Sequence, residues 1–278
     1  MKIAFIGGGN MATALIGGML KQGFAAAELS AVEPFETARA KLAAQFGVAC
    51  AAAPSAALGD ADVIVLAVKP QNMRDAAQAV APYLGAQLIV SIAAGTRIVD
   101  LSRWLGSPTA ASPAPYESIV RCMPNTPALI GMGITGLYAA PAVSAAQRAS
   151  AERILRAVGD VVWVANEALI DPVTAVSGSG PAYVFYFLEA MAEAGIKLGL
   201  PADDVKRLAL ATFSGAAKLA AESPDDFATL RAKVTSKGGT TEAALNVMME
   251  RQVKEAIGSA LAAASARGKE LGEMLGRD

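Results

Sequence analysis

The chain has 278 residues, of which 54% are hydrophobic and 18% are charged, with a formal net charge of −1. This composition is typical of a folded protein with a sizeable core, made of one large domain or two of ordinary size. The chain contains no histidine, which excludes Ser-His-Asp and Cys-His nucleophiles, histidine-ligated metal sites and imidazole as a general base. Chemistry must therefore come from a cofactor, a carboxylate, a hydroxyl or backbone groups.

Two cysteines, Cys50 and Cys122, stand far apart and form no Cys-x-x-Cys pair. We therefore expect no metal site and no disulfide, and two reduced thiols in a cytoplasmic protein. The N-terminus reaches glycine after too few apolar residues for a secretory signal, and no run approaches the about 18 apolar residues of a membrane span. No block of like charges indicates a nucleic-acid or membrane-surface partner.

In the first half of the chain, short apolar runs alternate with amphipathic segments. The run at Val63–Val68 is continuous and rich in β-branched residues, as in a strand that is buried on both faces. This alternation predicts a doubly wound parallel sheet with helices on both faces. The predicted strands are Lys2–Ile6, Leu29–Val32, Val63–Val68 and Leu88–Ala93, and the predicted helices are Met11–Gln22, Glu36–Phe46 and Arg97–Leu105.

The next part of the chain begins with a proline-rich loop at residues 107–116. Strands are predicted at Ile119–Met123, Ile134–Tyr138 and Val161–Val164, with a helix at Ser144–Val158. After the last of these strands, only long alanine-rich segments with helical periodicity follow. We therefore expect an α/β domain over residues 1–165 and an all-α domain over residues 166–278.

Local patterns in the helical part lead to three expectations. Ser223 followed by Pro224 predicts a helix that begins at the proline. Helices rich in alanine and glycine pack closely and suit an oligomeric bundle. Four aromatic side chains at helical spacing are expected in the core, namely Tyr183, Phe185, Tyr186 and Phe187.

A glycine-rich turn links the first predicted strand to the first predicted helix. Residues 7–12 read Gly-Gly-Gly-Asn-Met-Ala, which fits the G-x-G-x-x-A pattern that binds a dinucleotide pyrophosphate at a helix N-terminus. The alternative is a glycine-rich turn without a ligand. The candidate coenzyme-binding residues here are Ile6, Gly7, Gly8, Gly9, Asn10, Met11 and Ala12.

Glu33 ends the second predicted strand. An acid at this point normally accepts hydrogen bonds from the ribose hydroxyls and repels a 2′-phosphate, which favours NAD. Arg39 lies close enough in sequence to shift the preference toward NADP, and a solvated loop carboxylate is a further interpretation of Glu33. NAD and NADP therefore both stay candidates.

Other candidate residues follow later strands, because ligands of doubly wound sheets bind at the carboxyl ends of strands. Lys69 is equally well interpreted as a lysine that marks where a strand reaches the surface. Asn125, a candidate catalytic residue, stands between two prolines and has the alternative role of capping its own turn. The candidates for coenzyme contact in these segments are Ala67, Val68, Lys69, Pro70 and Ala93.

Two glycine-containing loops precede helices in the C-terminal part. In the loop at residues 177–183, glycines on both sides of Ser179 permit a close backbone approach. The loop at residues 236–241 offers backbone N–H groups and hydroxyls that suit a small carboxylate, ahead of a helix near Glu242. Each loop alone is more simply a helix cap. The candidate catalytic residues in the second loop are Ser236, Gly239, Thr240 and Thr241.

Five segments together resemble the pyrroline-5-carboxylate reductase family over nearly the whole chain, namely residues 7–11, 67–70, 123–127, 177–183 and 238–241. The resemblance implies an N-terminal Rossmann-like domain that binds NADP or NAD and a helical domain that forms a homodimer or a ring of dimers. It also implies an active site between one subunit's dinucleotide domain and its partner's helices. There the glycine–threonine loop would hold the substrate carboxylate, with Thr241 near the ring nitrogen.

By the same resemblance, the chain reduces 1-pyrroline-5-carboxylate to L-proline, the last step of proline biosynthesis. A protonated cyclic imine is already an electrophile, so hydride can pass from nicotinamide C4 to ring carbon 5 without a general base. This suits a chain without histidine. The sequence departs from the common form of the family at Lys237, where a proline is usual.

Two other functions fit parts of the sequence. A reductase of the hydroxyacid dehydrogenase type needs a lysine early on the first long helix of the second domain, but the charged residues there are Glu189, Glu193 and, near the end, Lys197. A non-catalytic NAD(P) sensor has no need for the loop at residues 236–241. Turnover of a cyclic imine distinguishes the reductase from both.

Overall fold

A computed structural model describes residues 1–106 and 114–277. Their contacts divide the chain into a first unit, Met1–Ser179 with Ala263–Asp278, and a second unit, Gly180–Ala262. The predicted domains, 1–165 and 166–278, divide the chain by sequence pattern and not by contact, and that division stays a prediction. Most of the predicted loop at 107–116 lies outside the described residues.

The first unit is built on an eight-stranded sheet with the order β3-β2-β1-β4-β5-β6-β7-β8. Every neighbouring pair is parallel except β6 with β7. The predicted α/β class is confirmed, and each predicted strand coincides with an observed one. The strands are β1 (Ile3–Ile6), β2 (Leu29–Val32), β3 (Ala49–Ala51), β4 (Val63–Leu66), β5 (Leu88–Ser91), β6 (Ile119–Met123), β7 (Gly133–Ala139) and β8 (Gly159–Trp163).

The antiparallel pair is the one departure from the predicted parallel arrangement among the described strands. A parallel neighbour needs a crossover connection of about a dozen residues or more. Between the end of β6 at Met123 and the start of β7 at Gly133 there is only a short segment that contains a 3-10 turn over Thr126–Ile130. The chain therefore reverses, and β7 and β8 run antiparallel to the other strands.

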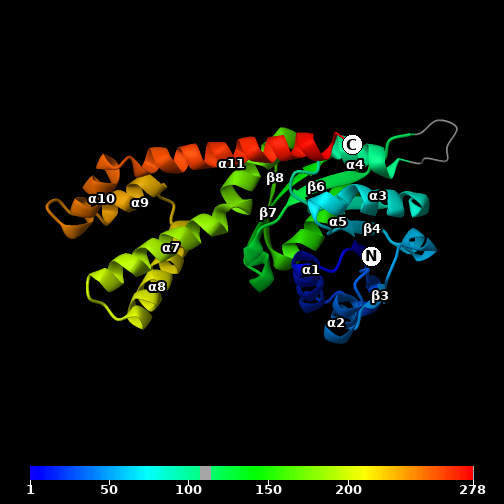
Figure 1. Ribbon diagram of the computed structural model, residues 1–278, viewed down its shortest axis with the longest axis horizontal. Coiled ribbons are helices and arrows are strands. Elements are labelled where there is room, and N and C mark those ends of the chain that lie inside the picture. The colour runs from blue at the N-terminus through cyan, green and yellow to red at the C-terminus, as the bar shows by residue number, and fades with distance from the viewer. Residues whose placement is uncertain (107–113, 278) are drawn as a thin grey trace. The chain divides into compact units, whose positions relative to one another are not determined.

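Helices cover both faces of the sheet, as the alternating pattern predicts (Figure 1). On one face, α1 (Asn10–Lys21), α2 (Glu36–Phe46) and α5 (Ala145–Leu155) pack over side chains such as Phe5 and Val65. On the other face, α3 (Met73–Val80) and α4 (Ile98–Leu105) pack over Ile64 and Ile89. These two apolar layers hold the strands in register, so the carboxyl ends of the parallel strands share one edge.

Two elements of the first unit are not apparent from the sequence. The edge strand β3 is only three residues long, and its alanines, Ala49 and Ala51, are exposed, so its sequence lacks the large β-branched side chains of a buried strand. Helix α3 is short, and prolines at positions 70 and 82 flank it. Both elements form because neighbouring parts of the sheet offer hydrogen bonds or an apolar surface, which local sequence patterns do not report.

The segment at residues 177–183 is helical for most of its length and is not the predicted loop. α6 (Ile170–Val173) runs into a π-helical turn (Thr174–Gly178), and α7 (Gly180–Lys197) follows. The Ser177 hydroxyl donates to the Val173 carbonyl at 2.9 Å, and the Ser179 N–H donates to the Thr174 carbonyl at 2.8 Å. These bonds satisfy carbonyls in the widened turn, so a segment rich in glycine and serine stays helical.

The second unit is all-helical, as predicted, and β8 is the last strand among the described residues. α7 and α8 (Ala202–Glu222) pack together, with the rings of Phe187 and Phe213 6.5 Å apart. The helix expected to begin at Pro224 begins instead at Phe227, because Asp226 accepts the Thr229 N–H at 2.7 Å and caps it. The remaining helices are α9 (Phe227–Lys233), α10 (Thr240–Glu250) and α11 (Val253–Leu275), whose last turns belong to the first unit.

Few apolar side chains are buried within the second unit. Its buried hydrophobic residues are Val205 and Ala209, whereas Phe185 and Tyr186 are 65% and 71% exposed. The prediction that the aromatic run lies in a core is therefore wrong for these two side chains within the single chain. Apolar exposure on this scale is typical of a surface that meets another protein. Among the described helices, none is long and apolar enough to span a membrane.

Candidate functional site

The first part of the site is the edge of the sheet where β1, β2 and β4 end. β1 lies between β2 and β4. The Gly7 N–H donates to the Val32 carbonyl at 2.8 Å, and the Ala67 N–H donates to the Ile6 carbonyl at 2.8 Å. The structure thus brings together the glycine turn, the end of β2 and the segment after β4, as the sequence predicts.

Each glycine of the turn meets a different environment. Gly7 has a φ of +98°, and a Cβ there would lie 2.8 Å from the Ala67 carbonyl oxygen. At Gly8 a Cβ would collide with the Leu42 side chain. A Cβ at Gly9 would meet nothing within 4 Å. The first two glycines therefore permit close packing of the turn, while the third leaves open space in front of it.

That open space lies at the N-terminus of α1. Gly9 is the N-cap residue, and no side chain caps the helix. The N–H groups of Asn10, Met11 and Ala12 stand in the first turn, where they have no intrahelical acceptors, and the positive end of the helix dipole is there too. An uncapped helix start beside an open glycine fits a dinucleotide pyrophosphate.

Glu33 follows β2 and is only 7% exposed. Its Oε2 atom accepts the Gly8 N–H at 2.8 Å, and its Oε1 atom accepts the Phe35 N–H at 2.9 Å. The Arg39 guanidinium donates instead to the carbonyls of Glu33 and Pro34, at 2.8 and 3.1 Å. The carboxylate is thus fixed beside the glycine turn, and the interpretation of Glu33 as a solvated loop acid is wrong.

The remaining candidates of the first unit follow β4, β5 and β6. Lys69 is exposed directly after β4, and Ala93 is buried just beyond β5. Asn125 is 9% exposed, and its Oδ1 atom accepts the Ile134 N–H at 3.0 Å. The side chain of Asn125 therefore holds its own loop, as the alternative interpretation predicts. Its amide nitrogen donates no hydrogen bond to the described residues.

The glycine–threonine loop lies in the second unit, before α10. Gly238 has a φ of +72°, and the Gly239 N–H donates to the Ser236 carbonyl at 3.0 Å. Gly239 is the N-cap residue of α10 and provides no side chain to cap it. The helix begins at Thr240, slightly earlier than the expected start near Glu242. Ser236, Thr240 and Thr241 therefore surround an uncapped helix start.

Sequence reasoning did not identify the role of Glu242 in this loop. Its Oε2 atom accepts the Gly238 N–H at 2.6 Å. Glu242 thus occupies one N–H group of the predicted carboxylate-binding set and leaves the first-turn groups of α10 for a ligand. The sequence does contain an indication of this contact, because an acid in the first turn of a helix, here Glu242, often accepts a preceding N–H group.

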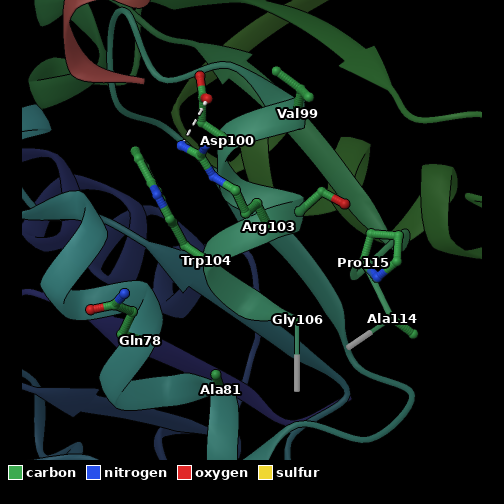
Figure 2. Close-up of a pocket in the computed structure, with 10 residues that line it drawn as sticks. Gln78, Ala81, Val99, Asp100, Arg103, Trp104, Gly106, Ala114 and Pro115 are labelled. Atoms are coloured by element: carbon green, nitrogen blue, oxygen red, sulfur yellow. Dashed lines mark ion pairs between the residues drawn. The ribbon is translucent and has the colours of Figure 1, made fainter. Parts of the chain in front are cut away.

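A cavity of 820 Å³ lies on the outer side of α3 and α4, apart from the predicted site (Figure 2). Trp104 forms part of its wall, and Asp100 and Arg103 form an ion pair of 3.5 Å there. The residues drawn around it come from α3 and the turn after it, from α4 and the residue after it, and from the segment before β6. No predicted site residue lines this cavity.

The sheet edge and its glycine turn define the class of the protein, a dinucleotide-dependent oxidoreductase with an added helical unit. Residues 2–95 match the family model described as NADP oxidoreductase coenzyme F420-dependent. Residues 167–271 match the model described as pyrroline-5-carboxylate reductase dimerisation. The chain belongs to the pyrroline-5-carboxylate reductase family.

Individual relatives cover nearly the whole chain. It is 50% identical to a pyrroline-5-carboxylate reductase of Pseudomonas aeruginosa, over 99% of this chain and 98% of that protein. The solved structure of a pyrroline-5-carboxylate reductase from Coxiella burnetii is 37% identical, with a TM-score of 0.89 and coverage of 97% and 98%. The pyrroline carboxylate reductase of Plasmodium falciparum, solved with NADP bound, is 29% identical, with a TM-score of 0.83 and 98% coverage of both chains.

Proposed function

We propose that this protein reduces 1-pyrroline-5-carboxylate to L-proline with NADH or NADPH, as the final step of proline biosynthesis. Membership of the family over the full length of the chain is the observation that carries the proposal. The uncapped start of α1 beside the open Gly9 supports the coenzyme part of it. The glycine–threonine loop before α10 supports the substrate part.

The nicotinamide coenzyme supplies hydride from C4 to ring carbon 5 of the protonated imine. The chain's own task is to bind and orient the two reactants. The first-turn N–H groups of α1 bind the pyrophosphate, and the segments at Ala67–Pro70 and Ala93 border the nicotinamide half. A chain with no histidine suffices, because hydride transfer to an imine that is already protonated requires no general base.

In the second unit, the first-turn N–H groups of α10 bind the substrate carboxylate. Thr241 makes one hydrogen bond at the imine nitrogen, and Ser236, Gly239 and Thr240 shape the loop around the ring. Asn125 contributes indirectly, because its carboxamide oxygen fixes the loop after β6. We assign these roles by position and by chemistry.

The helical unit joins this chain to a second copy, as a dimer or a ring of dimers. Exposed aromatic side chains on α7 support this assembly. We place the protein in the cytoplasm, because Cys50 and Cys122 are both free and Cys122 is buried.

The proposal is tested by following oxidation of NADH and NADPH with and without 1-pyrroline-5-carboxylate, and by identifying the product by chiral chromatography. We expect oxidation that depends on the imine and yields L-proline. Coenzyme binding without turnover would refute the proposal and favour a sensor. Turnover with 2-hydroxy acids but not with the imine would favour the hydroxyacid dehydrogenase type.

A further inference from the structure

We propose that the protein prefers NADH to NADPH and that Glu33 sets this preference. The inference rests on the proposed function, because it concerns the coenzyme of the same site. An acid at the end of the second strand in a dinucleotide-binding fold faces the adenosine ribose. The structural question is whether this acid can move away from a 2′-phosphate or is held in place.

The contacts of Glu33 show that it is held in place. The Glu33 residue is 7% exposed, and each carboxylate oxygen accepts one backbone N–H, from Gly8 and from Phe35. An exposed glutamate could swing into solvent to admit a phosphate. Here that movement would break two hydrogen bonds to backbone donors, one of them in the glycine turn itself.

The same geometry leaves capacity for a ribose. A carboxylate oxygen can accept more than one hydrogen bond, so each oxygen of Glu33 can still accept a hydroxyl proton. The 2′- and 3′-hydroxyls of NADH provide two such donors. A 2′-phosphate provides no comparable donor and adds about two negative charges next to a buried carboxylate.

A nearby cation, Arg39, is held against backbone carbonyls. The Arg39 Nη1 atom donates to the carbonyls of Glu33 and Pro34, both in the turn that follows β2. The segment therefore disfavours a phosphate and favours a free diol.

The test is the dissociation constant of each coenzyme, measured by isothermal titration calorimetry without substrate. We expect the wild-type protein to bind NADH at least about tenfold more tightly than NADPH. Glu33→Gln removes the charge and should reduce this ratio at least about fivefold. Glu36→Gln is the matched control, because it removes the charge of an exposed glutamate three residues after Glu33. It should leave the ratio of the two dissociation constants within about twofold of wild type.

Three results would overturn the inference. The first is equal or tighter binding of NADPH by the wild-type protein, and loss of that binding in Arg39→Ala would then identify Arg39 as the determinant. The second is a Glu33→Gln ratio no different from that of Glu36→Gln. The third is binding of neither coenzyme. If Glu33→Gln does not fold, as judged by circular dichroism, the wild-type ratio alone decides.

Binding without substrate also separates this inference from the proposed function. A preference for NADH without reduction of 1-pyrroline-5-carboxylate would refute the proposed function and leave the inference standing. Imine reduction with equal affinities for the two coenzymes would support the proposed function and refute the inference.

Discussion

Thr241 is the second residue of α10, in the first turn that follows the N-cap residue Gly239. If its hydroxyl bonds the imine nitrogen, Thr241→Ala removes one hydrogen bond to a charged group. We expect kcat/KM for the imine to fall about ten- to a hundredfold, with an unchanged melting temperature. Ser214→Ala is the matched control, because it removes a hydroxyl that bonds only the Leu210 and Ala211 carbonyls within α8. Full activity of Thr241→Ala would refute the assigned role.

Tyr116 provides a test of alkaline stability in the first unit. Its hydroxyl donates to the Gln87 carbonyl, and burial raises its pKa to about 12. A tyrosine in the unfolded chain ionises near about 10. Between these two values the unfolded state loses its proton first, so the free energy of unfolding decreases as the pH rises.

We therefore expect the wild-type protein to lose more stability than Tyr116→Phe between about pH 9 and 11.5. Urea unfolding of both proteins at the two pH values measures the difference. Other ionisable groups titrate in both proteins, so their contributions to the free energy of unfolding cancel in the comparison. The same loss in both proteins would show that Tyr116 does not contribute to the pH dependence.

At the scale of elements, a buried arginine connects β6 to α6. Arg121 has a side chain that is 4% exposed, and its guanidinium contacts Glu167 at 3.0 Å and Asp171 at 3.3 Å. Glu167 also accepts the Ile98 N–H at the start of α4, at 2.7 Å. This network joins a strand and two helices.

Arg121→Met leaves two partly buried carboxylates without their cation. We expect the free energy of unfolding to fall by about 3–5 kcal/mol, measured by denaturant titration. Arg156→Met is the control, because Arg156 is 49% exposed and its ion pairs with Glu152 and Asp160 lie at the surface. We expect no measurable change in the control. Equal effects of the two substitutions would contradict the importance of the network.

The elements predicted correctly from the sequence are those with a strong local signal. β4 is a continuous β-branched run, and α1 follows a glycine-rich turn. The elements that differ depend on contacts or connection lengths. β7 is antiparallel because its connection from β6 is short, and the widened turn at Thr174–Gly178 depends on serine and threonine hydroxyls that bond preceding carbonyls.

For the candidate site, the sequence likewise predicted which segments meet but not the individual contacts of their side chains. The glycine turn and Glu33 stand together, because parallel neighbouring strands end at one edge. Local patterns could not show that both oxygens of Glu33 are occupied by backbone donors. They also could not show that Asn125 bonds Ile134, or that Glu242 takes the Gly238 N–H, since each contact depends on how the loop folds.

At the scale of the whole molecule, the second unit requires a partner to cover its apolar side chains. Phe185 is 65% exposed on α7. We expect Phe185→Asp to reduce the size of the assembly, measured by size-exclusion chromatography with light scattering, because a charge would be buried in the interface. Val99→Asp is the control, since Val99 is 63% exposed on α4 of the first unit. An unchanged assembly in Phe185→Asp would place the interface elsewhere.

The most direct test of the whole account is to follow the transferred hydrogen. The protein is incubated with 1-pyrroline-5-carboxylate and NADH that carries deuterium at both C4 positions, and the product is examined by NMR and mass spectrometry. The account predicts L-proline with one deuterium, located at C5. Proline without deuterium, or bound coenzyme with no proline formed, would contradict it.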